Sequence, residues 1–361
     1  MLSRTASVPS LDAICLVESP LQVLNALEAR ARFGSAPERT WLLLLDNPKW
    51  SSQRGLTQTS RAASLEPWAR FDTVSMAPAT GRLAGLEWYL HVRRWSGRAT
   101  HQFRDVDTVF VGNYESPAML HVANVLRPRR VVILDDGTQS VRIGHERRAG
   151  LAIRALRQPG RRAVYRLLGL DIAPYLSLVF FSAYDIQPGA DDDLVPCTYD
   201  HLRSRLCRHD VSDHAVFLGN PVVEDGDMTI ETYVTHLRQV VASLGPHPVV
   251  YRSHRREQTS KLERLARDVG VPIHEPDDVI EVDLLSGAER ASIIASFYSS
   301  ALLTCGRLLQ EPARVVCFRL PERAIVESRR HLVDAVYAAI TADPYVLVRD
   351  LPASTGAGPT H

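Results

Sequence analysis

The sequence has few of the features that mark membrane, secreted or nucleic-acid-binding proteins. None of its apolar runs reaches the roughly 18 residues that a membrane-spanning helix needs. Its N-terminus has no basic segment followed by an apolar run, so no secretory signal peptide is expected. The net charge is only +1, which argues against a nucleic-acid partner. These absences predict a soluble, cytoplasmic protein.

Cysteine and lysine are also scarce. The five cysteines are scattered, with no CxxC or Cys/His spacing, so we expect reduced thiols and no zinc site. Lysine occurs only at positions 49 and 261, and nearly all other basic residues are arginine. Arginine favours bidentate contacts to phosphate and carboxylate groups.

The residues that are present predict two α/β domains. A chain of 361 residues is too long for one ordinary core, and 45% hydrophobic content is typical of globular proteins. Apolar strands alternate with helical patterns in both halves, which indicates parallel, doubly wound sheets. Residues 187–200 are rich in Pro, Gly and Asp. We therefore expect Rossmann-like domains over 1–186 and 187–361, facing each other across a cleft.

Eleven short runs have the apolar character of buried strands. They are 12–17, 40–46, 71–76, 108–111, 131–134 and 176–181 in the first half, and 215–218, 248–251, 271–274, 292–297 and 315–318 in the second. Residues 1–10 are predicted to be a disordered lead.

The strand at 131–134 ends in Asp135, Asp136 and Gly137, where we expect the chemistry. Ligands of open α/β sheets bind beyond the carboxyl ends of the strands. Successive strand side chains point to opposite faces, so one aspartate is expected to aim at substrate while the other braces the loop. An ordinary helix N-cap explains the same residues, and both interpretations stay open at this point.

Other polar groups follow predicted strands. They are Ser19 and Gln22, Asn113, His254 with Arg255, Arg256 and Glu257, and the pair Ser299 and Ser300. Together they offer a base, an acid, cations and hydroxyl groups, a set suited to moving a group away from a phosphate leaving group. His247 precedes its strand and His254 follows it, so only His254 is expected at the reactive edge.

Residues 142–175 are rich in arginine, with apolar residues at helical spacing. The segment is either a solvated helical surface, which we favour, or a surface for peripheral association with the inner face of an anionic membrane.

The order of five motifs resembles bacterial GT-B sialyltransferases, above all the capsular polysialyltransferases and the lipooligosaccharide sialyltransferases of glycosyltransferase family 52. The motifs are Glu18–Gln22, Asp135–Gly137, Phe217–Pro221, Tyr251–Glu257 and Ser299–Leu302. They span residues 14 to about 304. The resemblance implies a GT-B-like fold.

The resemblance also implies roles for two residues. Asp136 is the general base on the acceptor hydroxyl, and His254 protonates or hydrogen-bonds the departing CMP phosphate. Arg255 stands where the family has a proline, which is a departure from the pattern.

The remaining predicted site residues fall into two groups. On the donor side, the resemblance implies that Ser299 and Ser300 bind the CMP phosphate and that Glu281 contacts cytidine, and we expect Arg255, Gly219 and Asn220 to complete the group. On the acceptor side, we expect Ser19, Gln22, Asn113 and Asp135 to line the cleft.

The resulting prediction is an inverting, metal-independent sialyltransferase that uses CMP-sialic acid or a related nonulosonate in bacterial surface polysaccharide synthesis. No cofactor is expected, because CMP leaves as a monophosphate and no metal must bridge a diphosphate. A CMP-Kdo or UDP-sugar GT-B enzyme and a non-catalytic subunit of a polysaccharide assembly complex are the alternatives.

Overall fold

A computed structural model describes residues 11–47, 52–75, 84–99, 106–137, 139–152, 154–207, 210–311 and 314–351. The expected disordered lead, residues 1–10, lies outside these ranges. The chain divides into two compact units, Met1–Leu202 and Arg203–His361.

Unit 1 is built on a parallel sheet in the order β3-β2-β1-β4-β5-β6-β7. Its strands are β1 (Ala13–Val17), β2 (Thr40–Leu45), β3 (Arg70–Val74), β4 (Thr108–Val111), β5 (Arg130–Leu134), β6 (Val179–Ser182) and β7 (Asp193–Pro196). Its helices are α1 (Pro20–Arg32), α2 (Gln53–Ala63), α3 (Ala84–Ala99), α4 (Pro117–Leu126), α5 (Gln139–Arg148), α6 (Arg154–Arg157) and α7 (Pro159–Leu167), with the 3-10 helix η1 (Pro37–Arg39); α8 (Asp200–Ser204) spans the division.

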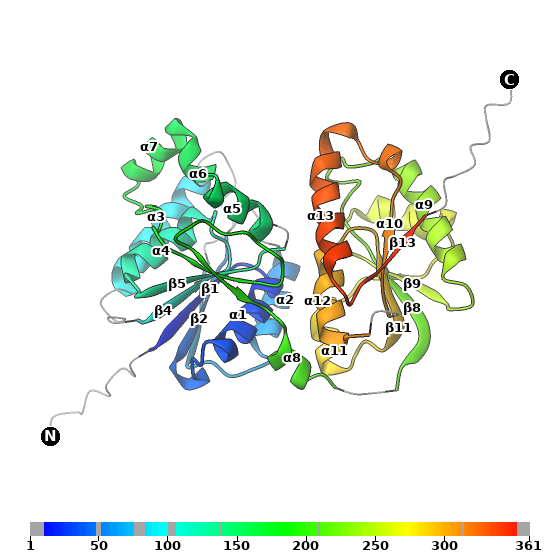
Figure 1. The fold of residues 1–361 in the computed structure, drawn as a ribbon, viewed down its shortest axis with the longest axis horizontal. Helices are drawn as coiled ribbons and strands as arrows, with labels where there is room; N and C mark the ends of the chain where they lie inside the picture. Colours follow the sequence, from blue (N-terminus) through cyan, green and yellow to red (C-terminus); the bar gives the residue numbers. More distant parts are fainter. Residues whose placement is uncertain are drawn as a thin grey trace. The chain divides into compact units, whose positions relative to one another are not determined.

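The central strands of unit 1 are buried because helices cover both faces of the sheet. Every residue of β1, β2 and β4 is buried. Helices α1 and α2 lie on one face, and α3, α4 and α5 lie on the other (Figure 1). Strands covered on both faces read as continuous apolar runs, which is why the sequence revealed them.

Unit 2 repeats the same winding with six parallel strands in the order β10-β9-β8-β11-β12-β13. Its strands are β8 (Ser212–Leu218), β9 (Val249–Arg252), β10 (Ile273–His274), β11 (Ala291–Ser296), β12 (Val315–Arg319) and β13 (Leu347–Asp350). Its helices are α9 (Ile230–Ser243), α10 (Thr259–Asp268), α11 (Ile280–Ser286), α12 (Ser300–Leu309) and α13 (Arg330–Ala342), with the 3-10 helices η3 (Glu322–Ala324) and η4 (Glu327–Arg329).

Each sheet has one point where the strand order reverses. In unit 1 this switch point lies between β1 and β4, and in unit 2 it lies between β8 and β11. Such points leave a crevice at the carboxyl ends of the strands, and ligands of doubly wound proteins bind there. We call this side of each sheet its carboxyl edge. The prediction of two Rossmann-like doubly wound domains is confirmed.

The division between the units differs from the predicted boundary at 186/187. Strand β7 pairs with β6, which extends the first sheet past the predicted boundary. The Glu28 carboxylate then accepts the backbone N–H groups of His201 and Leu202, at 3.0 and 2.9 Å. Asp192 of this Asp-rich segment is buried and forms two 2.6 Å contacts with Arg147.

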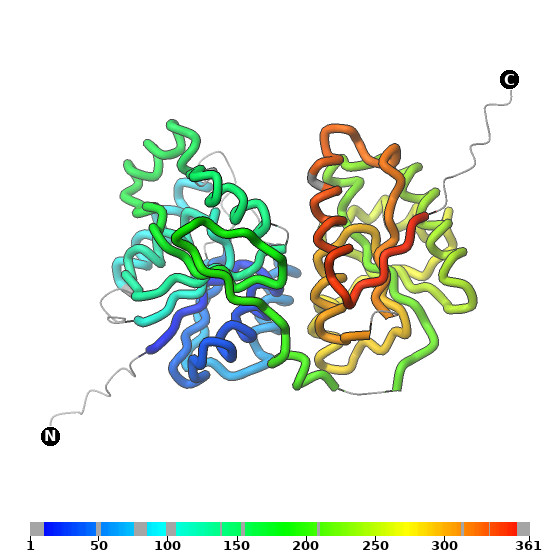
Figure 2. The backbone as a smooth tube through the Cα atoms, viewed as in Figure 1, coloured from blue at the N-terminus to red at the C-terminus, as the bar shows by residue number. Residues whose placement is uncertain are grey.

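The last helix and strand, α13 and β13, were not predicted. Figure 2 shows the chain passing from α13 back to the sheet, where β13 pairs with β12.

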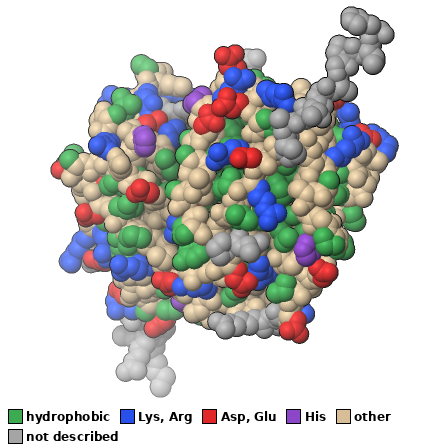
Figure 3. Space-filling view, turned by 45° about the vertical axis from the view of Figure 1, so that its right-hand side comes forward, with side chains coloured by type: hydrophobic (Ala, Val, Ile, Leu, Met, Phe, Trp, Pro, Cys, Tyr) green, Lys and Arg blue, Asp and Glu red, His purple; other side chains and the backbone are tan. Residues whose placement is uncertain are grey.

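On the face shown in Figure 3, acidic and basic side chains are interspersed. None of the helices in the described ranges combines the length and apolar character that crossing a bilayer takes.

Candidate functional site

The loops after β1 and β4 are joined at the switch point of unit 1. Ser116 is the N-cap of α4, and its hydroxyl donates a 2.9 Å hydrogen bond to Glu18 Oε1. Ser116 Oγ also accepts the N–H of Met119 at 3.5 Å. Because a serine has one hydroxyl hydrogen, its donor is committed to the Glu18 carboxylate.

Gln22 lies beneath these loops and braces them. Its buried side-chain oxygen accepts the backbone N–H of Glu18 at 2.7 Å. A Cβ at Gly112 would lie 2.3 Å from that oxygen and 2.9 Å from the Leu16 carbonyl, so only glycine fits there. Ser19, the half-buried N-cap of α1, accepts the N–H of Gln22 at 3.4 Å. The Gln22 side chain is therefore turned into the fold, whereas we expected it to line an acceptor cleft.

Glu18 follows β1 directly and lies at this carboxyl edge, although the sequence singles it out only as the first residue of the Glu18–Gln22 motif. Burial raises its pKa from 4.5 to about 7, the Ser116 hydrogen bond opposes the rise, and the Asp136 carboxylate adds to it. The last effect shows that the ends of β1 and β5 bring two carboxylates within electrostatic range. The acidic residue directly after the first strand was the only signal for this in the sequence.

The two aspartates after β5 lie in different surroundings, as alternation along a strand predicts. Asp135 is 3% exposed; its Oδ2 accepts the N–H of Ala183 at 2.6 Å, and its carbonyl accepts the Asn25 amide at 2.9 Å. Asp136 is half-buried, and its backbone N–H donates to Ser140 Oγ at 3.4 Å. Asp135 therefore braces the loop rather than lining a cleft, and Asp136 is the more accessible of the two.

Asn113 follows β4 and belongs to a polar network at the same carboxyl edge. Its Oδ1 accepts the N–H of Glu115 at 2.9 Å and the amide of Gln139 at 3.2 Å. Arg142 contacts the Glu115 carboxylate at 2.6 Å, which raises the pKa of the arginine. Asn113 is half-buried and is thus held in place by the start of α5.

In unit 2, the loop after β9 fixes the orientation of His254. The backbone N–H of His254 donates to Glu257 Oε2 at 2.6 Å. The N–H of Arg256 donates to His254 Nδ1 at 3.2 Å. Since Nδ1 accepts, the neutral imidazole carries its proton on Nε2. His254 is half-buried at the carboxyl edge. Its second ring nitrogen, Nε2, is a hydrogen-bond donor.

Glu257 anchors this loop through a buried ion pair. Its Oε1 lies 2.6 Å from Lys261 Nζ and accepts the Tyr251 hydroxyl at 2.6 Å. Burial raises the pKa of Glu257, and the Lys261 ammonium opposes the rise. Lys261 also donates to the Asn220 carbonyl at 2.9 Å. The loops after β8 and β9 are therefore tied together.

Gly219 and Asn220, predicted on the donor side, are packed into this network. A Cβ at Gly219 would lie 2.3 Å from Glu257 Oε2 and 2.7 Å from the Tyr251 hydroxyl. The Asn220 side chain is buried, accepting the Tyr233 hydroxyl and donating to the Tyr298 carbonyl, each at 3.5 Å. Gly219 has no side chain and that of Asn220 is buried, so both residues shape the edge without extending from it.

Ser299 and Ser300 lie where α12 begins, at the switch point of unit 2. Ser299 is the N-cap, and its Oγ accepts the N–H of Ala301 at 3.3 Å. Both serines are half-buried. The first N–H groups of a helix have no partner within it, and with the helix dipole they favour an anion. Two hydroxyls at this position are suited to a phosphate.

Glu281 is buried in the first turn of α11. Burial raises its pKa to about 7, and the nearby Arg252 lowers it. Arg252 is itself held by Asp283 at 2.5 Å and by the Asp278 carbonyl at 2.6 Å. Near neutral pH Glu281 therefore exists in both protonated and ionised forms.

The other basic residues near β9 lie at two different edges of the sheet, and His247 lies at the edge predicted for it. That histidine contacts Asp213 at 2.6 Å, near the start of β8 and away from the carboxyl edge, which confirms its predicted place. Arg255 is exposed in the His254 loop, and Arg256 forms contacts of 3.0 and 2.8 Å with Asp225.

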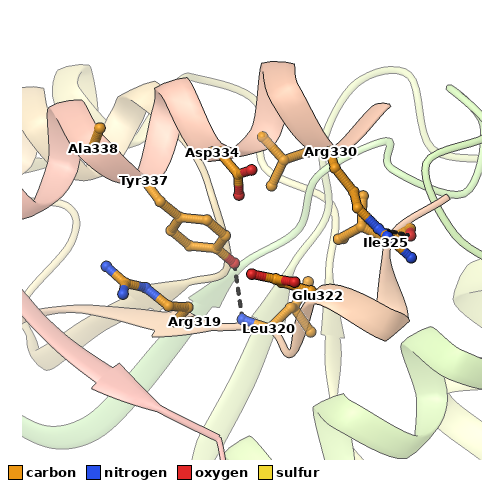
Figure 4. Close-up of a pocket in the computed structure, with 9 residues that line it drawn as sticks. Arg319, Leu320, Glu322, Ile325, Arg330, Asp334, Tyr337 and Ala338 are labelled. Carbon is orange, nitrogen blue, oxygen red and sulfur yellow. Dashed lines mark hydrogen bonds between the residues drawn. The ribbon is translucent and has the colours of Figure 1, made fainter. Parts of the chain in front are cut away.

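A cavity of about 260 Å³ lies between the end of β12 and α13, away from every predicted site residue. Figure 4 shows the Tyr337 hydroxyl at its floor, accepting the N–H of Leu320 at 3.0 Å. The Tyr337 ring lies edge-on to Tyr298, 5.7 Å between centroids, and Tyr298 directly precedes Ser299. No pattern in the sequence predicts this cavity, because α13, which forms one of its walls, was not predicted. In the described part of the chain, no group of three or more His, Cys, Asp or Glu side chains is placed to hold a metal ion.

No protein-family model and no curated protein matches the sequence. Among solved structures, the chain resembles a Listeria monocytogenes protein described as a UDP-N-acetylglucosamine 2-epimerase, with 12% identity, coverage of 90% of this chain and 82% of that one, and a TM-score of 0.53. A second UDP-N-acetylglucosamine 2-epimerase has 13% identity, coverage of 90% and 81%, and a TM-score of 0.51. A sialyltransferase from Photobacterium damselae has 10% identity, coverage of 93% and 99%, and a TM-score of 0.43. The chain thus has a GT-B-like fold of two Rossmann-like domains.

Proposed function

We propose that this chain is an inverting, metal-independent glycosyltransferase that moves sialic acid or a related nonulosonate from a CMP-sugar to a glycan hydroxyl. The observation that carries the proposal is the orientation of His254 at the carboxyl edge of unit 2. A backbone N–H occupies its Nδ1, so Nε2–H is the atom that can donate to a leaving phosphate.

The donor phosphate is assigned to the start of α12. Ser299 and Ser300 offer hydroxyls there, and the helix dipole favours the anion. As the bond between the anomeric carbon and the phosphate oxygen breaks, the electron pair stays with CMP. His254 Nε2–H then donates to that oxygen and stabilises the developing charge.

The acceptor is assigned to unit 1. Asp136 takes the proton of the attacking hydroxyl while its oxygen forms the new bond to the anomeric carbon. Glu18 lies within electrostatic range of Asp136 and shares the site with it. Bacterial capsule or lipooligosaccharide synthesis is the setting we assign to this reaction.

A UDP-sugar enzyme is the second candidate, because the same GT-B-like fold occurs in the UDP-N-acetylglucosamine 2-epimerases named above. CMP-Kdo as donor, or a non-catalytic role in a polysaccharide assembly complex, would leave the fold unchanged.

Thermal unfolding with CMP, UMP, UDP and GDP at equal, high concentration tests the nucleotide. A ligand at about 100 times its dissociation constant adds roughly 2.7 kcal/mol of stability, enough to shift the midpoint. We expect a shift with CMP that Ser299→Ala/Ser300→Ala removes and that Ser286→Ala, at the C-terminal end of α11, retains. A shift with UDP and none with CMP would overturn the proposal and favour the second candidate.

Product formation with a panel of CMP-sugars and glycan acceptors tests the reaction itself. CMP-sialic acid and CMP-Kdo separate the two donor classes. Asp136→Asn is expected to abolish transfer while leaving the CMP-induced shift in place. An Asp136→Asn variant as active as the wild type would contradict the assigned base.

A further inference from the structure

Unit 1 carries an exposed apolar and basic segment on and around α7. Four large apolar side chains there face solvent: Leu151 is 52% exposed, Val164 37%, Leu167 86% and Leu176 92%. They fall within 26 consecutive positions, between α5 and β6. Isolated exposed leucines are ordinary, but this concentration in one segment calls for an explanation.

The apolar residues of α7 are on its outer side because of how the helix is anchored. Tyr165 is its buried residue and packs edge-on against Tyr89 of α3, with 5.3 Å between ring centroids. Successive helical residues are rotated by about 100°, so Leu167 points roughly opposite to Tyr165. Figure 1 shows α7 at the outer end of unit 1, beyond α3 and α4. A helix that only covers the core would carry polar residues on this side.

The same helix is basic. Arg161, Arg162 and Arg166 are exposed, and α7 contains no acidic residue. Two arginines of α5 differ, because Arg142 and Arg147 are paired with Glu115 and Asp192. The α7 surface, defined as Arg161, Arg162, Val164, Arg166 and Leu167, therefore presents cations beside a leucine that projects outward.

We propose that the α7 surface docks this protein on an anionic lipid bilayer. Because α7 has no acidic residue, the phosphate headgroups of the lipids can supply negative partners for its arginines. The region where headgroups meet acyl chains supplies an apolar phase for Leu167. A free phosphate would use the arginines and leave the leucine in water, so the apolar residue favours a lipid surface. The composition of residues 142–175 favours a solvated surface, but the outward direction of Leu167 favours the membrane surface.

Co-sedimentation of the full chain with vesicles tests the proposal. One set of vesicles is phosphatidylcholine alone, and the other contains phosphatidylglycerol. We expect binding to the anionic set only, weakened when salt is raised from about 0.1 M to about 1 M, where the screening length falls from about 10 Å to about 3 Å. Each arginine near the surface contributes about fivefold to partitioning, so Arg162→Glu/Arg166→Glu should bind more than about 25-fold more weakly.

Two further variants separate the apolar contribution. Leu167→Ser is expected to weaken binding about tenfold, and Val164→Ser, on the same surface, provides a second test if Leu167→Ser does not fold. Arg267→Glu and Val326→Ser, at exposed positions of unit 2, are the matched controls and should bind like the wild type.

Equal binding to both vesicle sets, no binding to either, or α7 variants that bind like the controls would overturn the proposal. Inorganic phosphate that displaces the protein at millimolar concentration would indicate a simple anion site and would also overturn it. Because the assay contains no nucleotide or acceptor, its result is independent of the proposed glycosyl transfer.

Discussion

The Ser116 hydroxyl donates to the Glu18 carboxylate at 2.9 Å and joins the two loops that flank the switch point of unit 1. Glu18 thus holds the two loops together, and it also titrates near neutral pH, because burial raises its pKa to about 7. Several expected outcomes follow from contacts of this kind at the two carboxyl edges.

Glu18→Gln should stabilise the protein at high pH relative to low pH. Below about pH 4.5 Glu18 is protonated in both the folded and the unfolded chain. Between pH 4.5 and about 7 the folded chain binds this proton more tightly, so the free energy of unfolding falls as pH rises. Glutamine does not titrate, so it removes this fall in the free energy of unfolding. The fall is at most about 3 kcal/mol, and it is smaller for a half-buried group.

Urea unfolding at pH 4 and pH 8 measures this difference. The stability of Glu18→Gln relative to the wild type should increase between the two pH values, whereas the exposed Glu263→Gln should show no such increase. A Glu18→Gln difference that is the same at both pH values would refute the raised pKa.

Gly112→Ala should destabilise unit 1 by about 1–3 kcal/mol, because overpacking forces its neighbours to move. The new methyl would lie 2.3 Å from the Gln22 oxygen that holds Glu18. Gly85→Ala is the control: space around Gly85 on α3 is open, and alanine favours a helix by about 1 kcal/mol. Thermal midpoints that move in the same direction for both variants would contradict the close approach.

Glu257 and Lys261 should be strongly coupled. Replacing either partner alone, as in Glu257→Gln or Lys261→Met, leaves a buried charge and is expected to cost about 3–5 kcal/mol. A double-mutant cycle by urea unfolding should give a coupling above about 1.5 kcal/mol. The half-buried, more accessible pair Arg264 and Asp268 on α10 has the same i,i+4 spacing and should couple by about 0.5 kcal/mol or less. Equal coupling in the two cycles would show that burial does not strengthen the first pair.

His254→Ala should lower kcat for glycosyl transfer by about 10²–10⁴-fold, the usual contribution of a positioned proton donor. The affinity for CMP should change little, because Ser299 and the α12 N-terminus remain. His247→Ala, at the opposite edge beside Asp213, should leave kcat unchanged. Steady-state kinetics with CMP titration checks both, and equal losses in the two variants would remove His254 from its assigned role.

Most strands of both sheets could be predicted because helices cover the sheets on both faces, so β1, β2 and β4 read as unbroken apolar runs. The edge strands β7 and β13 were missed because they are partly exposed and have mixed composition. Their place depends on pairing with β6 and β12, which no local pattern records.

The position of the candidate site along the chain could also be predicted, since polar residues directly after strands mark the carboxyl edge. Which of those residues turn inward could not. Gln22, Asp135 and Asn220 are polar and follow strands, yet their side chains are buried braces. Glu18 gained its importance from burial and from Asp136, which is more than a hundred positions away in the sequence.

The sequence by itself determined the two doubly wound units and the chain positions of Asp136, His254 and Ser299, because strand periodicity and its interruption are local properties. Only the tertiary structure decided the tautomer of His254, the ionisation of Glu18 and the outward direction of Leu167. Each of these depends on atoms distant in the chain or on which helix face meets the core, and those contacts exist only in the folded protein.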